Sequence, residues 1–352
     1  METWGLANVP MQSLYVHIPF CARKCPYCDF YSLSDMQLQG AYIDECVRRL
    51  RESRTTEGGR PYNTAYIGGG TPSVLPVDLL EKLLCEVRCS GEFTIECNAA
   101  SVTPEFVSAI AKGGVNRVSM GLQSAVASER AALGRTADLA QVQQAIALLN
   151  CDNFSLDVML GIPGQTLASL QTTLECCAQA GAKHVSAYLL NIEPGTPFAA
   201  NPPALPCEDA QAELYLFACD WLEQHGYAQY EISNFAQPGY ESQHNLNTWR
   251  CGEYHAIGPG AHGFTHGRRW HYPRDLQAFL HGEPPSDDGE GGDDEERAML
   301  ALRLTQGIAS PSDKLRQRAK QLGNLVLCDE HGLRLTRAGM LLSNTVIAAL
   351  LN

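Results

Sequence analysis

Apolar and polar positions alternate along this chain in blocks that predict strands and helices in turn. Short apolar runs bounded by glycine, proline or polar residues are typical of buried strands. Six such runs occur, at residues 14–18, 64–67, 93–97, 117–122, 154–160 and 184–190. Helical periodicity fills the intervals between and after them, near residues 36–53, 75–88, 104–112, 126–149, 166–181 and 208–225.

Strands that are separated by helices pair in parallel, and right-handed crossovers curl such a sheet toward a barrel or a doubly wound layer. The number of strands alone does not separate these two folds. The unusual polar residues follow the strands, however, and this is where the loops of a barrel build a site. We therefore predict an α/β fold, an open six-stranded parallel (β/α)6 partial TIM barrel over residues 1–282.

The end of the chain has a different pattern. Residues 283–296 are acidic and poor in apolar side chains, which predicts a linker or an exposed loop. Helical patterns at 294–305 and 311–322 then precede two short apolar pieces and a final helix at 336–351. This order predicts a small helical or winged-helix-like module over 297–352. Since the module lacks a strong basic face, we expect a structural or docking role rather than DNA binding.

Composition and charge narrow the class of protein. The 352 residues are 45% hydrophobic and 18% charged, as in folded globular proteins. A net charge of -13 repels polyanions, so we expect no nucleic acid partner. No secretory signal opens the chain and no apolar run approaches the roughly 20 residues of a membrane span, which predicts a cytoplasmic protein. The 14 cysteines then favour reduced thiols, metal ligation or burial over disulfides.

Three of these thiols, Cys21, Cys25 and Cys28, lie within eight residues in the loop after the first predicted strand. Thiolates favour zinc or iron–sulfur clusters, and a structural zinc site normally has a fourth ligand close by. No second CxxC pair is present. A 4Fe-4S cluster that is held by three thiolates leaves one iron open to a small molecule. We predict such a cluster, with zinc and an accidental group of thiols as the alternatives.

A glycine run, Gly68-Gly69-Gly70-Thr71-Pro72, follows the second predicted strand. The absence of side chains allows the backbone to approach a ligand closely, which predicts a ligand-binding turn. Thr71 can also cap the next helix with Pro72 in its first turn, a purely structural role.

The CxxxCxxC loop, with Tyr27 before its last cysteine, and the glycine run together resemble the radical S-adenosylmethionine superfamily. The resemblance implies a 4Fe-4S cluster on the three cysteines, whose fourth iron takes the amino and carboxylate groups of S-adenosylmethionine. Reductive cleavage of the sulfonium then yields a 5′-deoxyadenosyl radical. The resemblance also implies nine residues that contact S-adenosylmethionine: Tyr15, Tyr27, Gly69, Gly70, Thr71, Glu96, Gln123, Arg135 and Asp157.

Taken singly, the charged residues of this set are typical of surface groups and salt bridges. The chain also departs from the superfamily after Glu96. Close relatives read Asn-Pro-Gly there, whereas this chain reads Cys97-Asn98-Ala99-Ala100, which leaves the shape of that loop open.

Five of the ten histidines lie between residues 244 and 271: His244, His255, His262, His266 and His271. Imidazole suits metal ligation and proton transfer, although single histidines in loops are usually surface residues. The stretches 244–249 (HNLNTW) and 258–263 (GPGAHG) resemble the heme chaperone (HemW) branch of the oxygen-independent coproporphyrinogen III oxidase-like family. This resemblance implies heme binding by His244, because imidazole is a natural axial ligand of heme iron. Thr248 replaces the tyrosine of the branch's HNxxYW motif.

Two departures separate this chain from the true oxidases of that family. Phe30 stands where the oxidases carry a fourth cysteine, and only twenty residues precede Cys21. Both favour a heme chaperone that passes heme to acceptor proteins such as respiratory enzymes. The alternative is a radical oxidoreductase that acts on coproporphyrinogen III or another tetrapyrrole. Delivery to a membrane-bound acceptor would need peripheral membrane contact but no span.

Overall fold

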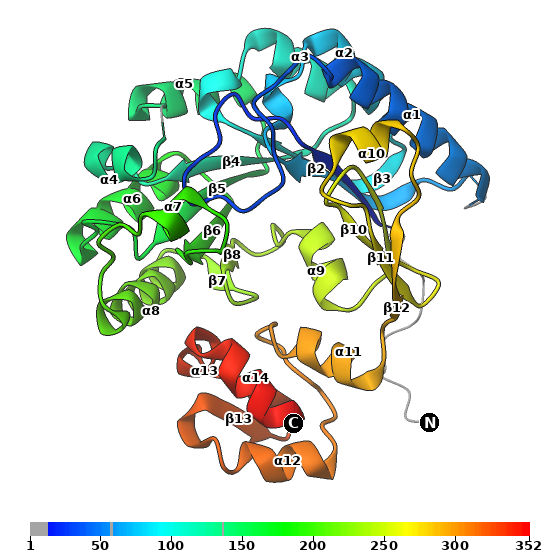
Figure 1. Ribbon diagram of the computed structural model, residues 1–352. Coiled ribbons are helices and arrows are strands. Elements are labelled where there is room, and N and C mark those ends of the chain that lie inside the picture. Colours follow the sequence, from blue (N-terminus) through cyan, green and yellow to red (C-terminus); the bar gives the residue numbers. More distant parts are fainter. Residues whose placement is uncertain (1–12, 57–58, 136) are drawn as a thin grey trace.

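A computed structural model describes residues 13–56, 59–135 and 137–352, and within them a twelve-stranded sheet and a separate two-stranded hairpin. The sheet has the order β12-β11-β10-β9-β1-β2-β3-β4-β5-β6-β8-β7 (Figure 1). The six predicted strands form its middle and pair in parallel in chain order. They are β1 (Ser13–Ile18), β2 (Tyr62–Gly69), β3 (Cys89–Cys97), β4 (Arg117–Gln123), β5 (Phe154–Leu160) and β6 (His184–Leu189). The prediction of an α/β fold with a mainly parallel sheet is confirmed.

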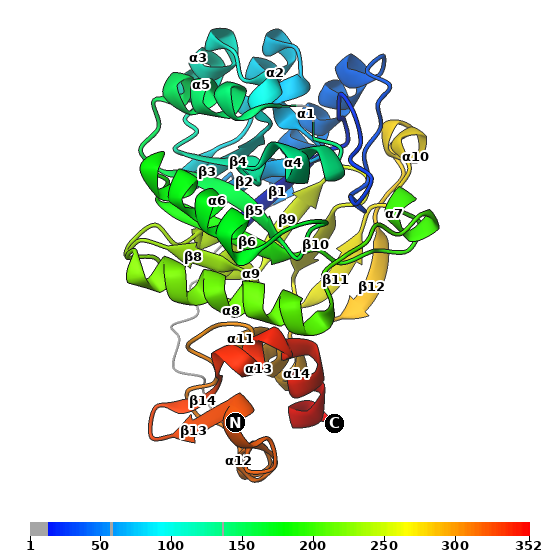
Figure 2. The ribbon, with the colours of Figure 1, turned by 90° about the vertical axis from the view of Figure 1, so that its left-hand side faces the viewer.

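Helices cover the convex face of this sheet (Figures 1 and 2). The predicted helix at 126–149 is in fact two short helices, α4 and α5. The helices of the βα units and of the loops after β6 are α1 (Gln39–Thr56), α2 (Val77–Leu84), α3 (Pro104–Lys112), α4 (Ala127–Ala132), α5 (Leu139–Leu149), α6 (Leu167–Gln179), α7 (Pro197–Ala200) and α8 (Glu208–Gln224).

The six central strands have one apolar and one polar face. On β1, Leu14, Val16 and Ile18 are fully buried in the main core. Because successive side chains of a strand point to opposite faces, Tyr15 and His17 lie on the other side. The same alternation places further polar residues on that concave side: Thr64, Tyr66, Glu92, Thr94, Glu96, Arg117, Ser119, Ser155, Asp157, His184 and Ser186. The concave side of the sheet is therefore a polar interior that can hold a site.

The sheet extends beyond the six predicted strands at both edges. β9 (Tyr254–Ile257) pairs with β1 in parallel, and β10 (His262–Thr265), β11 (Arg268–His271) and β12 (Ser286–Glu290) follow as antiparallel strands. At the other edge β8 (Asn234–Ala236) joins β6 and β7 (Ala228–Gln229) joins β8. Two helices connect these strands, α9 (Gln243–Trp249) and α10 (Leu276–Leu280). The prediction of six strands therefore describes only the middle of the sheet.

The acidic stretch at 283–296, which we expected to be a linker or exposed loop, contains the edge strand β12 and the start of α11. Most of its side chains are exposed, as expected, but the backbone of β12 pairs with β11. Asp287 forms an ion pair with Arg268 across the two strands. Acidic residues are compatible with an edge strand when a basic neighbour pairs with them, and composition alone does not reveal this pairing.

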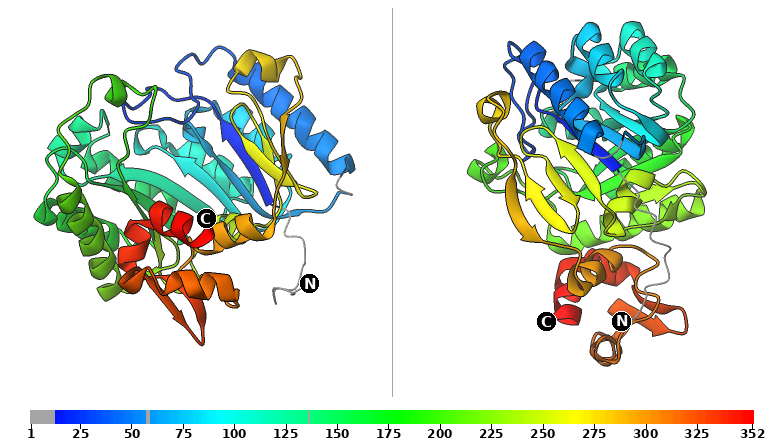
Figure 3. Two further views of the ribbon diagram at one scale, coloured as in Figure 1. Left: turned by 60° about the horizontal axis from the view of Figure 1, so that its bottom comes forward. Right: turned by 90° about the vertical axis from the view of Figure 1, so that its right-hand side faces the viewer.

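The chain ends in a small unit with a core of its own. It contains α11 (Asp294–Ala301), α12 (Asp313–Ala319), β13 (Val326–Asp329), β14 (Gly332–Leu335), α13 (Arg337–Leu341) and α14 (Ser343–Leu351). The predicted final helix is thus two helices that meet at Leu342. This unit lies below the end of the sheet at which the parallel strands begin (Figures 1 and 3). None of the helices in the described ranges is long and apolar enough to span a membrane.

Candidate functional site

The three predicted cluster ligands lie together. Cys21, Cys25 and Cys28 are free, partly exposed thiols in the loop after β1, and they line one end of a cavity of about 370 Å³. The Thr71 hydroxyl lies 3.5 Å from Cys21 Sγ, and Arg135 Nη1 donates to Cys25 Sγ at 3.7 Å. Burial raises the pKa of the Cys28 thiol. Grouped thiols beside a fixed guanidinium fit a thiolate-bound cluster, because the cation offsets part of the negative charge.

The glycine turn is held against the start of the cysteine loop. The Gly70 amide donates to the Ile18 carbonyl at 2.7 Å, and the Thr71 amide donates to the Phe20 carbonyl at 2.8 Å. A Cβ on Gly70 would lie 2.6 Å from that Phe20 carbonyl oxygen. Gly69 has a φ of +104°, which side chains disfavour. The turn therefore requires glycine, and it lines the cavity next to the thiols.

Thr71 does not act as the side-chain cap that we considered. It precedes a short 3-10 helix that starts at Pro72, but its side chain makes no capping hydrogen bond. The hydroxyl faces Cys21 instead. This placement fits the prediction that Thr71 belongs to the site.

Glu96 connects the glycine turn to the polar interior of the sheet. Its carboxylate accepts hydrogen bonds from the Tyr66 hydroxyl at 2.7 Å and from the Gly69 amide at 3.0 Å. Burial raises the pKa of Glu96 to about 7. A carboxyl group with this pKa changes its charge near neutral pH and can hold a proton or accept one.

Arg135, Gln123 and Asp157 line the same cavity as the glycine turn. Arg135 Nη2 donates to the Gly121 carbonyl at 3.0 Å, and a Cβ on Gly121 would lie 2.4 Å from that same nitrogen. Gln123 ends β4 with a φ of 66°, which turns the chain at the cavity. Asp157 accepts from Ser119 Oγ at 3.2 Å, and burial raises its pKa.

The two predicted tyrosines lie in different places. Tyr27 lines the cavity and packs against Phe198, with ring centroids 6.4 Å apart. Tyr15 is not among the residues that line the cavity. Its hydroxyl bonds to His17 Nδ1 at 3.0 Å, and its ring lies 6.2 Å from that of Tyr66, so it supports the wall from behind.

Several residues of the cavity wall were missed by the sequence analysis. They belong to the strands rather than to the loops that follow them: Tyr66, Ser119 and Ser186 lie inside strands, Arg117 begins β4, and Tyr188 lies one residue before the end of β6. Polar residues at every second position of apolar strands were the available signal, because in a barrel they point inward. Cys97 is buried in the main core and also lines the cavity.

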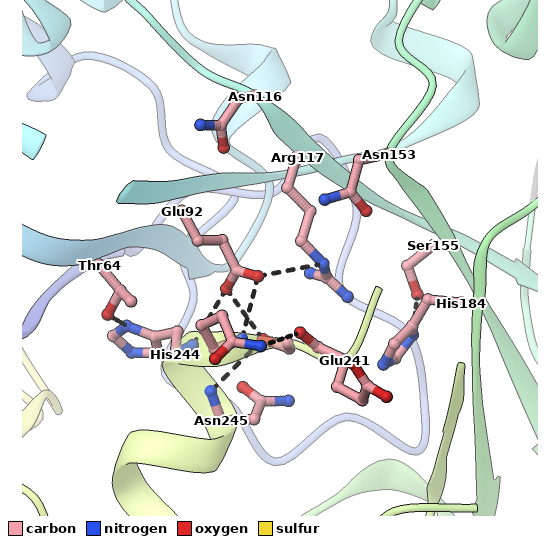
Figure 4. Close-up of polar contacts among 12 residues, drawn as sticks. Thr64, Glu92, Asn116, Arg117, Asn153, Ser155, His184, Glu241, His244 and Asn245 are labelled. Carbon is pink, nitrogen blue, oxygen red and sulfur yellow. Dashed lines mark hydrogen bonds and ion pairs between the residues drawn. The ribbon is translucent and has the colours of Figure 1, made fainter. Parts of the chain in front are cut away.

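His244 lies at the opposite end of the sheet from the thiols. It belongs to the first turn of α9, which lies below the start of the parallel strands, next to Thr64 at the beginning of β2 (Figure 4). Only 7% of its surface is exposed. The Thr64 hydroxyl donates to Ser13 Oγ at 2.7 Å, so its oxygen accepts from His244 Nδ1 at 3.0 Å.

This hydrogen bond decides the chemistry of the His244 ring. Nδ1 carries the proton, so Nε2 has the free lone pair. Burial lowers the pKa of His244 to about 3, which keeps the imidazole neutral. The neutral ring can therefore ligate a metal through Nε2, although in this position of α9 only 7% of the surface of His244 is exposed.

Glu92 holds α9 in place. Its carboxylate accepts from Ser242 Oγ at 3.2 Å, from the Gln243 amide at 3.0 Å and from the His244 amide at 3.0 Å (Figure 4). The same carboxylate lies 3.9 Å from Nε of the buried Arg117, a nitrogen without any hydrogen-bond partner in the described part of the chain. The Glu92 carboxylate thus accepts hydrogen bonds from the donors at the start of α9 and offsets the positive charge of the buried Arg117.

Known proteins resemble this chain over its full length. The family model of the Radical SAM superfamily matches residues 15–177. The heme chaperone HemW of Mycobacterium tuberculosis H37Rv is 35% identical over 100% of this chain and 98% of its own. HemW of Escherichia coli K12 is 37% identical over 79% of this chain and 78% of its own. HemW of Bacillus subtilis 168 is 32% identical over 97% of this chain and 99% of its own.

A solved structure shares the fold. The coproporphyrinogen III oxidase HemN from Escherichia coli, described as a radical SAM enzyme, superimposes with a TM-score of 0.82 at 20% identity, over 98% of this chain and 92% of its own. At this identity the likeness shows the fold alone. The relatives of 32 to 37% identity decide the family, and they confirm the predicted heme chaperone (HemW) branch. This chain belongs to the HemW family of the radical SAM superfamily.

Proposed function

We propose that this chain is a heme-binding chaperone that passes heme to acceptor proteins and carries a 4Fe-4S cluster with S-adenosylmethionine. The observation that supports this most is the combination of three thiols and a close-approach glycine turn in one cavity, in a chain that matches HemW from end to end. Phe30 lines the same cavity with 62% of its surface exposed, at the point where the oxidases carry a fourth cysteine.

Cys21, Cys25 and Cys28 would hold the cluster, and when bound it supplies one electron to the sulfonium of S-adenosylmethionine. Backbone groups of Gly69 and Gly70 and the Thr71 hydroxyl offer hydrogen bonds to the amino acid part of that molecule. Arg135 offers a cation to its carboxylate. The other predicted contacts, Glu96, Gln123, Asp157 and Tyr27, surround the remaining volume, and Tyr15 positions Tyr66 from behind.

Heme is the cargo, and we propose His244 Nε2 as its axial ligand. The free lone pair and the lowered pKa support this role. The burial of the ring adds a condition, because the ligand becomes accessible only when α9 moves away from the sheet. The proposed chaperone therefore binds heme in a conformation in which the contacts between Glu92 and α9 are open.

We also propose a finer division of the fold. The strands β1 to β6 with their helices form an incomplete (β/α)6 barrel, and residues 297–352 form a winged-helix-like module with the hairpin β13–β14 as its wing. The acidic stretch at 283–296 joins the barrel to the module, and its strand β12 pairs with β11 of the sheet. A cytoplasmic location is supported by the 14 cysteines, all of them free thiols, which persist under reducing conditions. Delivery of heme to respiratory proteins would then occur by peripheral contact at the membrane.

The decisive experiment begins with anaerobic cluster reconstitution of the full chain. We expect a brown protein with about four iron atoms per chain, binding of heme in a titration, and transfer of that heme to a heme-free respiratory cytochrome. His244→Ala should lose heme binding and keep its iron, whereas His331→Ala in the exposed turn of the C-terminal hairpin should keep both. Efficient decarboxylation of coproporphyrinogen III by the same preparation would instead establish the oxidoreductase.

A further inference from the structure

Two histidines and an aspartate meet on the outer part of the sheet, away from the cavity. His262 and His271 are directly opposite each other on β10 and β11, so their side chains lie on one face. Their rings stack with centroids 5.2 Å apart and planes at 27°. A β-bulge against β12 at Arg269/Trp270 leaves Asp288 without a partner in the register and turns it toward His271.

The three side chains already have the spacing of a coordination sphere. His271 Nδ1 lies 2.8 Å from Asp288 Oδ1 and 2.9 Å from Oδ2. One ligand atom from each residue lies within 4.8 Å of the others. Two ligand atoms that are each about 2.1 Å from a metal are roughly 3 Å apart, so the pair of His271 and Asp288 is preformed. His262, directly opposite His271, offers the third ligand atom.

His262 has no hydrogen-bond partner among the described residues, and it lies against a second imidazole. Desolvation and the neighbouring His271 lower its pKa, so the ring is neutral with a free lone pair at neutral pH. An ordinary His–Asp surface pair would account for His271 and Asp288 but leaves His262 unexplained. We propose that His262, His271 and Asp288 bind a divalent transition-metal ion of the zinc type.

The chemistry of the donors selects this class of ion. Two imidazoles and one carboxylate suit zinc and related first-row ions, whereas magnesium and calcium take oxygen ligands. The side chains of His271 and Asp288 are each 35% exposed, so water completes the coordination sphere. None of the three residues lines the cavity with the thiols. The metal site is therefore separate from the cluster site.

The location of the site suits an ion that stabilises the structure. β9 is parallel to β1, so the loop after β9 that leads to His262 lies at the same end of the sheet as the cysteine loop. Arg274, three residues after His271, forms an ion pair with Asp29 at 3.0 Å, and Asp29 follows Cys28 directly. A bound ion would tie β10, β11 and the edge strand β12 together, three strands that lie side by side (Figure 2). It would thereby support the wall behind the cysteine loop.

The test uses the full chain with its cluster in place, dialysed against a zinc buffer and analysed for both metals. We expect one zinc per chain in addition to the iron. His271→Asn and Asp288→Asn should each weaken zinc binding at least about tenfold and leave the iron content unchanged, which also reports that the barrel has folded. The matched control is His266→Asn, in the β10–β11 turn at a φ of 53° that asparagine tolerates.

Zinc should also raise the melting temperature of the wild type and of His266→Asn but not of the other two variants. The proposal is overturned if the wild type takes up no zinc beyond its iron. It is equally overturned if His271→Asn and Asp288→Asn bind zinc as tightly as His266→Asn.

Discussion

Replacing Glu92 by glutamine should increase heme affinity by loosening α9. The carboxylate accepts three hydrogen bonds from the start of α9 and faces the buried Arg117. Glutamine keeps one acceptor oxygen, but its NH2 group would face the Gln243 amide and the guanidinium. Loss of a charge-assisted hydrogen bond and of the countercharge of Arg117 destabilises the closed position of α9 by roughly 3 kcal/mol.

This magnitude sets the expected change in binding. About 3 kcal/mol raises the population of the open position by roughly 100-fold. If heme reaches His244 only in that position, the apparent affinity rises by the same factor, because it scales with the fraction of competent molecules. Heme titration followed by the Soret band measures the affinity. Hydrogen exchange of the α9 backbone amides measures the opening independently.

The two measurements must change together. The control Glu105→Gln alters an exposed carboxylate in the first turn of α3 and should change neither. The double variant with His244→Ala should exchange as fast as Glu92→Gln and gain no heme affinity. Faster exchange without tighter heme binding would refute the link between α9 and the heme ligand. Unchanged exchange would refute the role assigned to Glu92.

Three further predictions concern the cavity. Gly70→Ala should weaken S-adenosylmethionine binding at least about tenfold in calorimetry while the iron content stays normal, since the new methyl group would lie 2.6 Å from the Phe20 carbonyl oxygen; equal affinity would show that the turn is not a binding element. Cys25→Ala should lose the visible absorption and most of the iron of the cluster, and the exposed Cys85→Ala should retain both. Glu96 has a pKa of about 7 in the folded chain, above its ordinary value, so the folded state binds the proton more tightly and stability falls as pH rises toward 7. Urea denaturation should accordingly show Glu96→Gln gaining stability relative to the wild type between pH 5 and pH 8, and a difference that is independent of pH would contradict this assignment.

The sequence was most informative where the determinants are local. The apolar runs and the helical periodicity located the six central strands β1 to β6, because burial on a sheet imposes a short-range pattern. The three cluster thiols lie so close in the sequence that their spacing alone brings them together: Cys21, Cys25 and Cys28. The glycine run predicted a turn in which the backbone comes close to its neighbours, and at Gly70 a Cβ would indeed lie 2.6 Å from the Phe20 carbonyl oxygen. The match to HemW relatives confirmed the family to which these motifs point.

Predictions failed or stayed incomplete where distant segments meet. The acidic stretch at 283–296 has the composition of a linker, yet β12 pairs with β11, and Asp287 forms an ion pair with Arg268 across the two strands. The polar residues inside the strands, such as Tyr66 and Ser186, line the cavity only because the sheet curves around them. Local patterns do not encode which strands become neighbours at an edge, so β7 to β12 were not predicted.

The sequence by itself thus determined the chemical groups of this protein: three clustered thiols, a turn that must be glycine, and a histidine-rich segment. Only the tertiary structure decided what surrounds them. His244 and His271 are both histidines of one segment, but Thr64 and Glu92 enclose the first beneath the sheet, while a β-bulge against β12 brings Asp288 beside the second. The physical reason is that the state and accessibility of a side chain depend on its contacts, and these come from strands far away in the sequence.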